Sequence, residues 1–131
     1  MQRIARVAAA TFVLAGGALH LDLWRDGYRA IDYVGPLFVA NAVVSALLVV
    51  AILIRPGLIV GVAGVAFSVG SLVALVLSRT TGLLGFIERG WTEMAMQVTT
   101  AEVGAVVAIA VMMVAQRSPA PALWPAKGDA P

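Results

Sequence analysis

The sequence predicts an all-α integral membrane protein, an antiparallel bundle of four transmembrane helices. Of its 131 residues, 61% are hydrophobic and only 12% are charged. A soluble domain is about 45–50% apolar and about 25% charged, so this chain has too few charges to cover a surface in water. Its apolar residues also gather into four long segments, each near the ~20 residues that cross a bilayer.

The four predicted helices span about residues 6–20, 35–54, 57–78 and 92–115. The second segment begins with Gly35-Pro36, and proline is tolerated in the first turn of a helix. Only Arg55 and Pro56 separate the second and third segments, which predicts a tight antiparallel hairpin. Residues 1–117 therefore form one transmembrane domain, and the proline-rich residues 118–131 are predicted to be a disordered cytoplasmic tail.

The first apolar segment has a second interpretation. Arg3 and Arg6 precede an apolar stretch that ends at Gly16-Gly17-Ala18. This order is also typical of a signal peptide with a small-residue cleavage site. Cleavage would leave three spanning helices with the same orientation, so both interpretations stay open.

The basic residues near the helix ends predict the orientation, because cytoplasmic loops carry more Lys and Arg. With the N-terminus inside, five lie on the inner side and four on the outer side. This bias predicts a multi-pass membrane protein with both termini in the cytoplasm. The inner residues are Arg3, Arg6, Arg55, Arg117 and Lys127, and the outer ones are Arg25, Arg29, Arg79 and Arg89.

The two outer loops carry aromatic residues. Trp24, Tyr28 and Ile31 follow the i, i+4, i+7 spacing of a short amphipathic helix over residues 21–34. Such a helix lies in the membrane interface with its aromatic side chains at headgroup level. In the second loop, Phe86 and Trp91 are predicted to be interfacial anchors in the same way.

Glu102 is the most informative residue of the chain. It lies ten residues into the fourth segment, about 15 Å along the helix axis and so near the bilayer midplane. An acidic side chain there costs about 2.5–3.5 kcal/mol and marks function by default. We expect Thr99, Asn41 and Ser45 to form an intramembrane polar cluster with Glu102. This cluster has three interpretations: a hydrogen-bonded structural staple, a proton or cation site, and a contact with another subunit.

Small residues follow one face of the third segment. Lipid tails are as apolar as leucine, so membrane helices gain from the close backbone approach that small residues permit. The stripe is therefore predicted to be the central packing seam of the bundle, with the lining of a narrow polar pathway as the alternative. Its residues are Gly57, Gly61, Gly64, Ser68, Ser71 and Ser78.

His20 and Asp22 are candidates at the outer interface, where we expect His20 to hydrogen-bond to Asp22 or to the loop. A haem would need a second axial ligand, either Met94 or Met96 or the His20 of a second copy. Copper(I) bound by His20 and both methionines is also sensible, because thioethers suit that ion. With no cysteine and no catalytic motif, however, the sequence predicts no enzyme, no metal site and no cofactor.

Several segments of the chain resemble known proteins. They are residues 20–24 (HLDLW), 27–31 (GYRAI), 34–38 (VGPLF), Asn41-Ala42, 82–88 (GLLGFIE) and Glu102. Together these residues resemble uncharacterised small four-helix integral membrane proteins encoded in actinobacterial genomes. The resemblance implies a location in the plasma membrane and transfers no activity or site residue.

The function expected from the sequence is that of a small accessory or assembly subunit of a larger membrane complex. Its partners would be the lipid bilayer and a membrane protein or further copies of itself, and nucleic-acid binding has no basic footprint here. A small oligomeric transporter or proton/cation pathway using Glu102 and Asn41 is the alternative. Since four short helices leave little room for a substrate cavity, that alternative requires a dimer or more. An electron-transfer protein that binds haem or copper is the third class.

Overall fold

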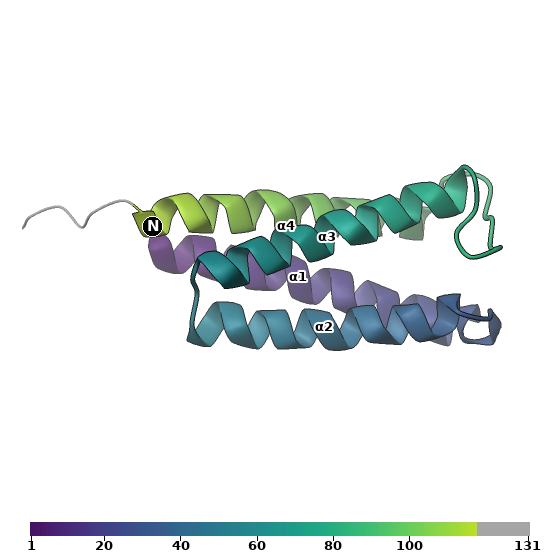
Figure 1. The fold of residues 1–131 in the computed structure, drawn as a ribbon, viewed down its shortest axis with the longest axis horizontal. Helices are drawn as coiled ribbons and strands as arrows, with labels where there is room; N and C mark the ends of the chain where they lie inside the picture. The colour runs from purple at the N-terminus through teal and green to yellow at the C-terminus, as the bar shows by residue number, and fades with distance from the viewer. Residues whose placement is uncertain (118–131) are drawn as a thin grey trace, which may run out of the picture.

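The computed structural model describes residues 1–117, and this part of the chain is all-helical, as the sequence predicts. Figure 1 shows four long helices, each long and apolar enough to cross a membrane. The predicted tail, residues 118–131, lies outside the described residues. The helices are α1 (Gln2–Arg25), α2 (Val34–Ile54), α3 (Leu58–Arg79) and α4 (Glu93–Arg117), with a short 3₁₀ helix η1 (Tyr28–Ala30) after α1.

The chain reverses its direction at each connection between helices (Figure 1). The start of α1, the α2–α3 connection and the end of α4 lie at one end of the molecule. There the side-chain amide of Gln2 donates a hydrogen bond of 3.0 Å to the carbonyl of Ala115. Residues 26–33 and 80–92 lie at the opposite end, which we call the loop end.

Helix α1 is central in the bundle, because it packs against both α2 and α4. It buries seven residues and α4 buries eight, whereas α3 buries four. The buried residues of α1 are mostly alanine and glycine, which bring its neighbours close: a Cβ added to Gly17 would meet the Cβ of Ser45 at 2.6 Å. The prediction that the third helix forms the central seam is therefore wrong, because α1 packs closely against two neighbouring helices and α3 against α4 alone.

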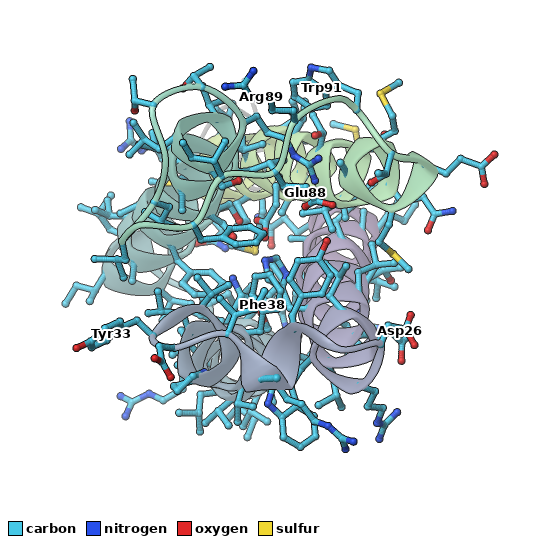
Figure 2. All side chains as sticks on the ribbon, turned by 90° about the vertical axis from the view of Figure 1, so that its right-hand side faces the viewer. Asp26, Tyr33, Phe38, Glu88, Arg89 and Trp91 are labelled. Carbon is cyan, nitrogen blue, oxygen red and sulfur yellow. The ribbon has the colours of Figure 1, made fainter. Side chains whose placement is uncertain are left out.

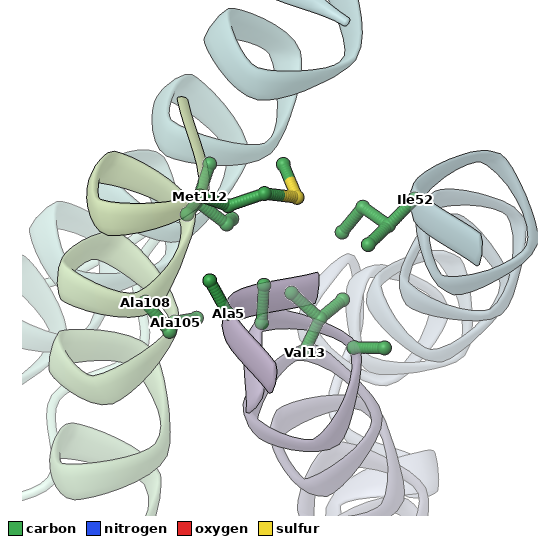
Figure 3. Close-up of a cluster of buried hydrophobic side chains, with 9 residues drawn as sticks. Ala5, Val13, Ile52, Ala105, Ala108 and Met112 are labelled. Carbon is green, nitrogen blue, oxygen red and sulfur yellow. The ribbon is translucent and has the colours of Figure 1, made fainter. Parts of the chain in front are cut away.

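The apolar core lies in the half of the bundle away from the loop end. Figure 3 shows small side chains of α1 and α4 facing the larger side chains of Ile52 and Met112. Alanine on both facing helices lets α1 and α4 approach closely, and the larger side chains fill the remaining space. The cluster consists of Ala5, Ala9, Ala10, Val13, Ile52, Ala105, Ala108, Ile109 and Met112.

The small residues of α3 face α4. A Cβ added to Gly61 would meet Met113 Sδ at 2.5 Å, and one added to Gly64 would meet Ile109 Cδ1 at 2.8 Å. These two glycines pack as predicted for the stripe, although against one neighbour only. Gly57 does not belong to the stripe, because it precedes α3 and a Cβ there would meet nothing within 4 Å.

Helices α2 and α3 are joined by the shortest connection, yet their backbones come close at few positions. The predicted tight hairpin of α2 and α3 is therefore wrong. Residues 55–57 form no helix; Gly57 is extended, with φ/ψ of −168°/177°, and Arg55 has φ/ψ of −135°/66°. Three residues reach up to about 10 Å, enough to hold two helix ends apart. The ring of helix contacts α2–α1–α4–α3 is thus open between α2 and α3.

The loop end also differs from its prediction. The first helix continues to Arg25 and includes Trp24, and only the single turn η1 follows it. The predicted amphipathic helix over residues 21–34 is therefore wrong. Gly27 has a φ of 123°, in the left-handed region that glycine adopts without strain, and it turns the chain there. As a result Tyr28 is directed back over the bundle and is half-buried.

Candidate functional site

A cavity of about 380 Å³ occupies the opening between α2 and α3, in the half of the bundle near the loop end. Side chains of α1, α4 and both loops close its other sides. Its lining is mainly apolar, with a few polar groups. The margins are exposed side chains of the two parted helices, so the cavity opens sideways between them. These margins are Leu37, Ala40 and Val44 on α2, and Ala66 and Gly70 on α3.

The deep wall of the cavity is polar, and three helices contribute to it. His20 comes from α1, Asn41 from α2 and Ser71 from α3. The amide nitrogen of Asn41 donates a hydrogen bond of 2.9 Å to Ser71 Oγ. Ser71 Oγ in turn lies 3.5 Å from Nε2 of His20. These three side chains thus form one hydrogen-bonded group, which we call the polar floor.

The His20 imidazole has a defined tautomer. Its Nδ1 lies 2.8 Å from the carbonyl oxygen of Gly16, and a carbonyl only accepts hydrogen bonds. Nδ1 therefore carries the proton and donates it to Gly16. In the neutral ring, Nε2 is then an acceptor, and it faces the polar floor. The side chain of His20 is 7% exposed.

Glu102 lies behind the polar floor, 2% exposed. A Cβ added to Gly16 would meet its Oε1 at 3.3 Å, so the carboxyl group rests against α1 where α1 has no side chain. The hydroxyls of Ser68 and Ser71 face this carboxyl group from α3. Ser68 Oγ is buried without the geometry of a formed hydrogen bond. The single hydrogen of Ser71 therefore has two acceptors within reach, Glu102 and His20.

A second polar group closes the cavity at the loop end. Tyr28 donates a hydrogen bond of 2.8 Å to Glu88 Oε1, and the Arg79 guanidinium lies 3.0 Å from Glu88 Oε2. Arg79 also donates to the carbonyl of Gly90 at 2.6 Å. Burial, and next the hydrogen bond to Glu88, raise the pKa of Tyr28 to about 12. We call these residues, Tyr28, Arg79 and Glu88, the outer clamp.

Aromatic rings connect the polar floor to the outer clamp. Phe38 lies edge-on to His20 at 5.4 Å and against Tyr28 at 5.3 Å, and Tyr28 lies 5.9 Å from Phe86. Figure 2 shows Phe38 and Glu88 directed toward the middle of the bundle, whereas Tyr33 points outward. Phe86, predicted to be an interfacial anchor, instead lines the cavity.

The predicted polar cluster is found in part. The hydroxyl of Ser45 donates to Asn41 Oδ1 at 3.4 Å, and Asn41 leads through Ser71 to the surroundings of Glu102. Thr99 does not join them, because its hydroxyl donates to the carbonyl of Ala95 in its own helix at 2.8 Å. In any helix, a threonine hydroxyl can donate to the carbonyl four residues earlier, so it does not need a nearby carboxylate as its acceptor.

The predicted pairing of His20 with Asp22 is wrong. His20 turns into the bundle, whereas Asp22 is exposed and lies 3.6 Å from Arg25. The two residues differ by two positions, about 200° around a helix, so they face opposite sides. Of the methionines considered as further ligands, Met96 is 58% exposed. Within residues 1–117, no three His, Cys, Asp or Glu side chains form a group that could hold a metal ion.

Sequence reasoning missed the outer clamp and the role of two serines. Ser68 and Ser71 were assigned to helix packing, yet they supply hydroxyls to Glu102 and to the polar floor. Tyr28 and Glu88 are 60 residues apart, and no local pattern joins them. One signal was available in the sequence. Because only 12% of the residues are charged, Arg79 at the end of α3 and Glu88 in the loop that follows it stand out as partners for an ion pair.

Comparison with known proteins places the chain in no family. No protein-family model matches it, and neither a curated protein nor a solved structure shows significant similarity to it. The cavity and the groups that line it are the features of the structure that bear on function.

Proposed function

We propose that this chain is a multi-pass protein of the bacterial plasma membrane that binds a small membrane-soluble molecule in the cavity between α2 and α3. The observation that carries the proposal is the cavity itself. Ligand sites are concave, mostly apolar pockets of about 300–1,000 Å³ with a few polar groups that orient the ligand. This cavity has that size, an apolar wall, and polar groups at its floor and at its loop end.

The proposed location follows from the surface of the helices. Large apolar side chains are exposed along all four of them, including Leu47, Ile59 and Val107 at 65%, 85% and 57%. Such a surface is stable against lipid tails and unstable in water. In the membrane, the helices form an antiparallel bundle, with both termini in the cytoplasm and the loop end outside. The cavity then opens to the lipid phase between α2 and α3.

The sideways opening decides the kind of ligand. A molecule that enters between α2 and α3 comes from the bilayer, because Tyr28, Phe86 and the outer clamp cover the cavity at the loop end. The sequence led us to expect little room for a substrate in one bundle. The separation of α2 from α3 provides that room within a single copy of the chain.

The test is to purify the tagged protein from its native membrane in mild detergent and to identify small molecules that co-purify, by native mass spectrometry and lipid extraction. Gly70→Leu fills the cavity mouth: a Cβ there meets nothing within 4 Å, so the larger side chain has space. The expected result is a bound molecule that the variant loses. Ala63→Leu, at an exposed position on the same helix outside the cavity, is the matched control and should retain it.

An unchanged set of molecules in wild type and Gly70→Leu contradicts the proposal. Loss in both variants also contradicts it, because the effect would then come from the added bulk on α3 and not from the cavity.

An accessory or assembly subunit of a membrane complex is the second candidate, and one observation favours it. The gap between α2 and α3 leaves apolar faces of both helices without a helical neighbour. A transmembrane helix of a partner protein would cover them. The same purification tests this candidate: a stoichiometric membrane protein that is lost in Gly70→Leu, without any bound small molecule, favours the accessory subunit over the ligand-binding protein.

A further inference from the structure

At the polar floor, the Ser71 hydroxyl has one hydrogen and two neighbouring acceptors, His20 and Glu102. Nε2 of His20 accepts, and the nearest donor is the Ser71 hydroxyl at 3.5 Å, beyond the usual O–H···N distance. That hydroxyl also faces Glu102. When its hydrogen is directed to Glu102, the imidazole nitrogen at the cavity wall has no donor. A buried acceptor without a partner costs about 1–3 kcal/mol, so a donor supplied by a ligand is stabilising there.

The neighbouring Asn41 has a donor to spare. Its amide carries two hydrogens, and one of them is used in the bond of 2.9 Å to Ser71. Its oxygen accepts a hydrogen bond of 3.4 Å from Ser45. His20 and Asn41 both line the cavity, so an acceptor and a donor of the protein meet the ligand at the same wall.

A hydroxyl group is the ligand group that satisfies both at once, because it donates one hydrogen bond and accepts others. A carbonyl or an ether oxygen would leave His20 unpaired, and an ammonium would leave Asn41 unpaired. The three residues of the polar floor carry no fixed charge, which also disfavours a ligand with a charged head group. The apolar wall between Phe38 and Gly70 then takes the body of the ligand, with the remainder in the lipid.

Resting on the proposed function, we propose that the ligand of this cavity is an amphiphile with a free hydroxyl, which donates to Nε2 of His20 and accepts from the amide of Asn41. Two kinds of membrane molecule share this chemistry, aliphatic alcohols and phenols. In both, the hydroxyl is the deep end of the ligand and the chain leaves between α2 and α3.

The experiment compares each hydroxyl compound with its methyl ether, because the ether keeps the apolar body and the acceptor oxygen, and a methyl group replaces the donor hydrogen. The purified protein in detergent is titrated with dodecanol and its methyl ether, and with nonylphenol and its methyl ether. Binding is measured from the rise in Tm with probe concentration. The expected result is that at least one hydroxyl compound binds about tenfold or more tightly than its ether. The pair with the larger ratio identifies the source as an aliphatic lipid alcohol or a phenol.

Two variants connect this ratio to the polar floor. His20→Phe keeps an aromatic ring against Phe38 and removes the acceptor, so the ratio should fall to about one while the ether still binds. If that variant does not fold, Asn41→Leu removes the donor to the ligand oxygen, which alcohol and ether share, so both should bind more weakly while the ratio is kept.

Equal binding of alcohol and ether in wild type, with both abolished by Gly70→Leu, overturns this inference and leaves the proposed function standing. Binding of neither, or equal binding to wild type and Gly70→Leu, overturns both. A ratio that persists unchanged in the folded His20→Phe variant also overturns the inference.

Discussion

The hydroxyl of Tyr28 donates a 2.8 Å hydrogen bond to Glu88, and this bond joins two loops that are 60 residues apart in the sequence. Arg79, 3.0 Å from the same carboxylate, holds Glu88 in position from the end of α3. The outer clamp therefore connects η1, the short helix after α1, with the end of α3.

Replacing Tyr28 by Phe should weaken the loop end while leaving the ring contacts to Phe38 and Phe86. A hydrogen bond to a charged group contributes about 1.5–3 kcal/mol when buried, and the half-buried position here reduces the effect to about 1 kcal/mol. The measurement is the Tm of the purified protein in detergent. Tyr33→Phe is the control, because Tyr33 is 71% exposed and should give an unchanged Tm.

The same contact predicts a loss of stability at alkaline pH. The pKa of Tyr28 is raised from 10.0 to about 12, so the folded state favours the protonated phenol. This contribution is fully present below pH 10 and is lost as the pH rises from about 10 to about 12. Wild type should thus lose more Tm over this interval than Tyr28→Phe. Parallel curves for the two proteins would contradict the prediction.

Two glycines should respond to alanine in opposite ways. In Gly17→Ala the new Cβ would lie 2.6 Å from the Cβ of Ser45, which cannot move without its backbone. Separation of α1 from α2 should cost about 1–3 kcal/mol. In Gly70→Ala the new Cβ meets nothing within 4 Å, and helix propensity favours alanine by about 1 kcal/mol. The Tm should fall in the first variant and stay or rise in the second.

Replacing Glu102 by glutamine should preserve the stability of the protein, whereas replacing it by leucine should lower the stability. Glutamine keeps an acceptor for the hydroxyls of Ser68 and Ser71, whereas leucine leaves Ser68 facing an apolar group and leaves Ser71 only His20 as an acceptor. Each unsatisfied buried hydroxyl costs about 1–3 kcal/mol. Glu102→Gln should therefore keep a Tm near that of wild type, and Glu102→Leu should lower it clearly. A reversed order would show that Glu102 is packed as an apolar residue.

The orientation in the membrane is testable because the chain has no cysteine. Asp26→Cys places a thiol at the loop end and Arg55→Cys one at the opposite end, both at exposed positions. In intact cells, a membrane-impermeant maleimide should label the first variant only. Labelling of the second alone would invert the proposed orientation, and labelling of both in lysed cells is the control.

The helices were predictable because hydropathy and length determine which segments cross a bilayer. For α2, residues 35–54 were expected and Val34–Ile54 form the helix. The ends of α1 were not predictable in this way, since a helix continues through charged residues such as Asp22 and Arg25 once it leaves the apolar region. Counting residues along a helix gives the depth of a side chain, which is why the sequence predicts Glu102, Asn41 and Ser45 to lie at a similar depth.

What counting along one helix does not give is the choice of partner. Thr99 lies on the same face as Glu102, yet the local carbonyl of Ala95 takes its hydrogen. The distance between α2 and α3 depends on the conformation of the three residues that join them and on how tightly α1 packs with its neighbours. These are tertiary properties, and the cavity is their product.

Because the bundle is open between α2 and α3, the occupancy of the cavity depends on the concentration of the ligand in the membrane. In the proposed arrangement, a molecule that enters between α2 and α3 comes from the lipid, so its mole fraction among the lipids, and not its aqueous concentration, governs binding. A constituent present at about one molecule in a hundred half-fills the site when the protein prefers it to ordinary acyl chains by about a hundredfold. That preference corresponds to about 2.7 kcal/mol, which a few hydrogen bonds at the polar floor can supply.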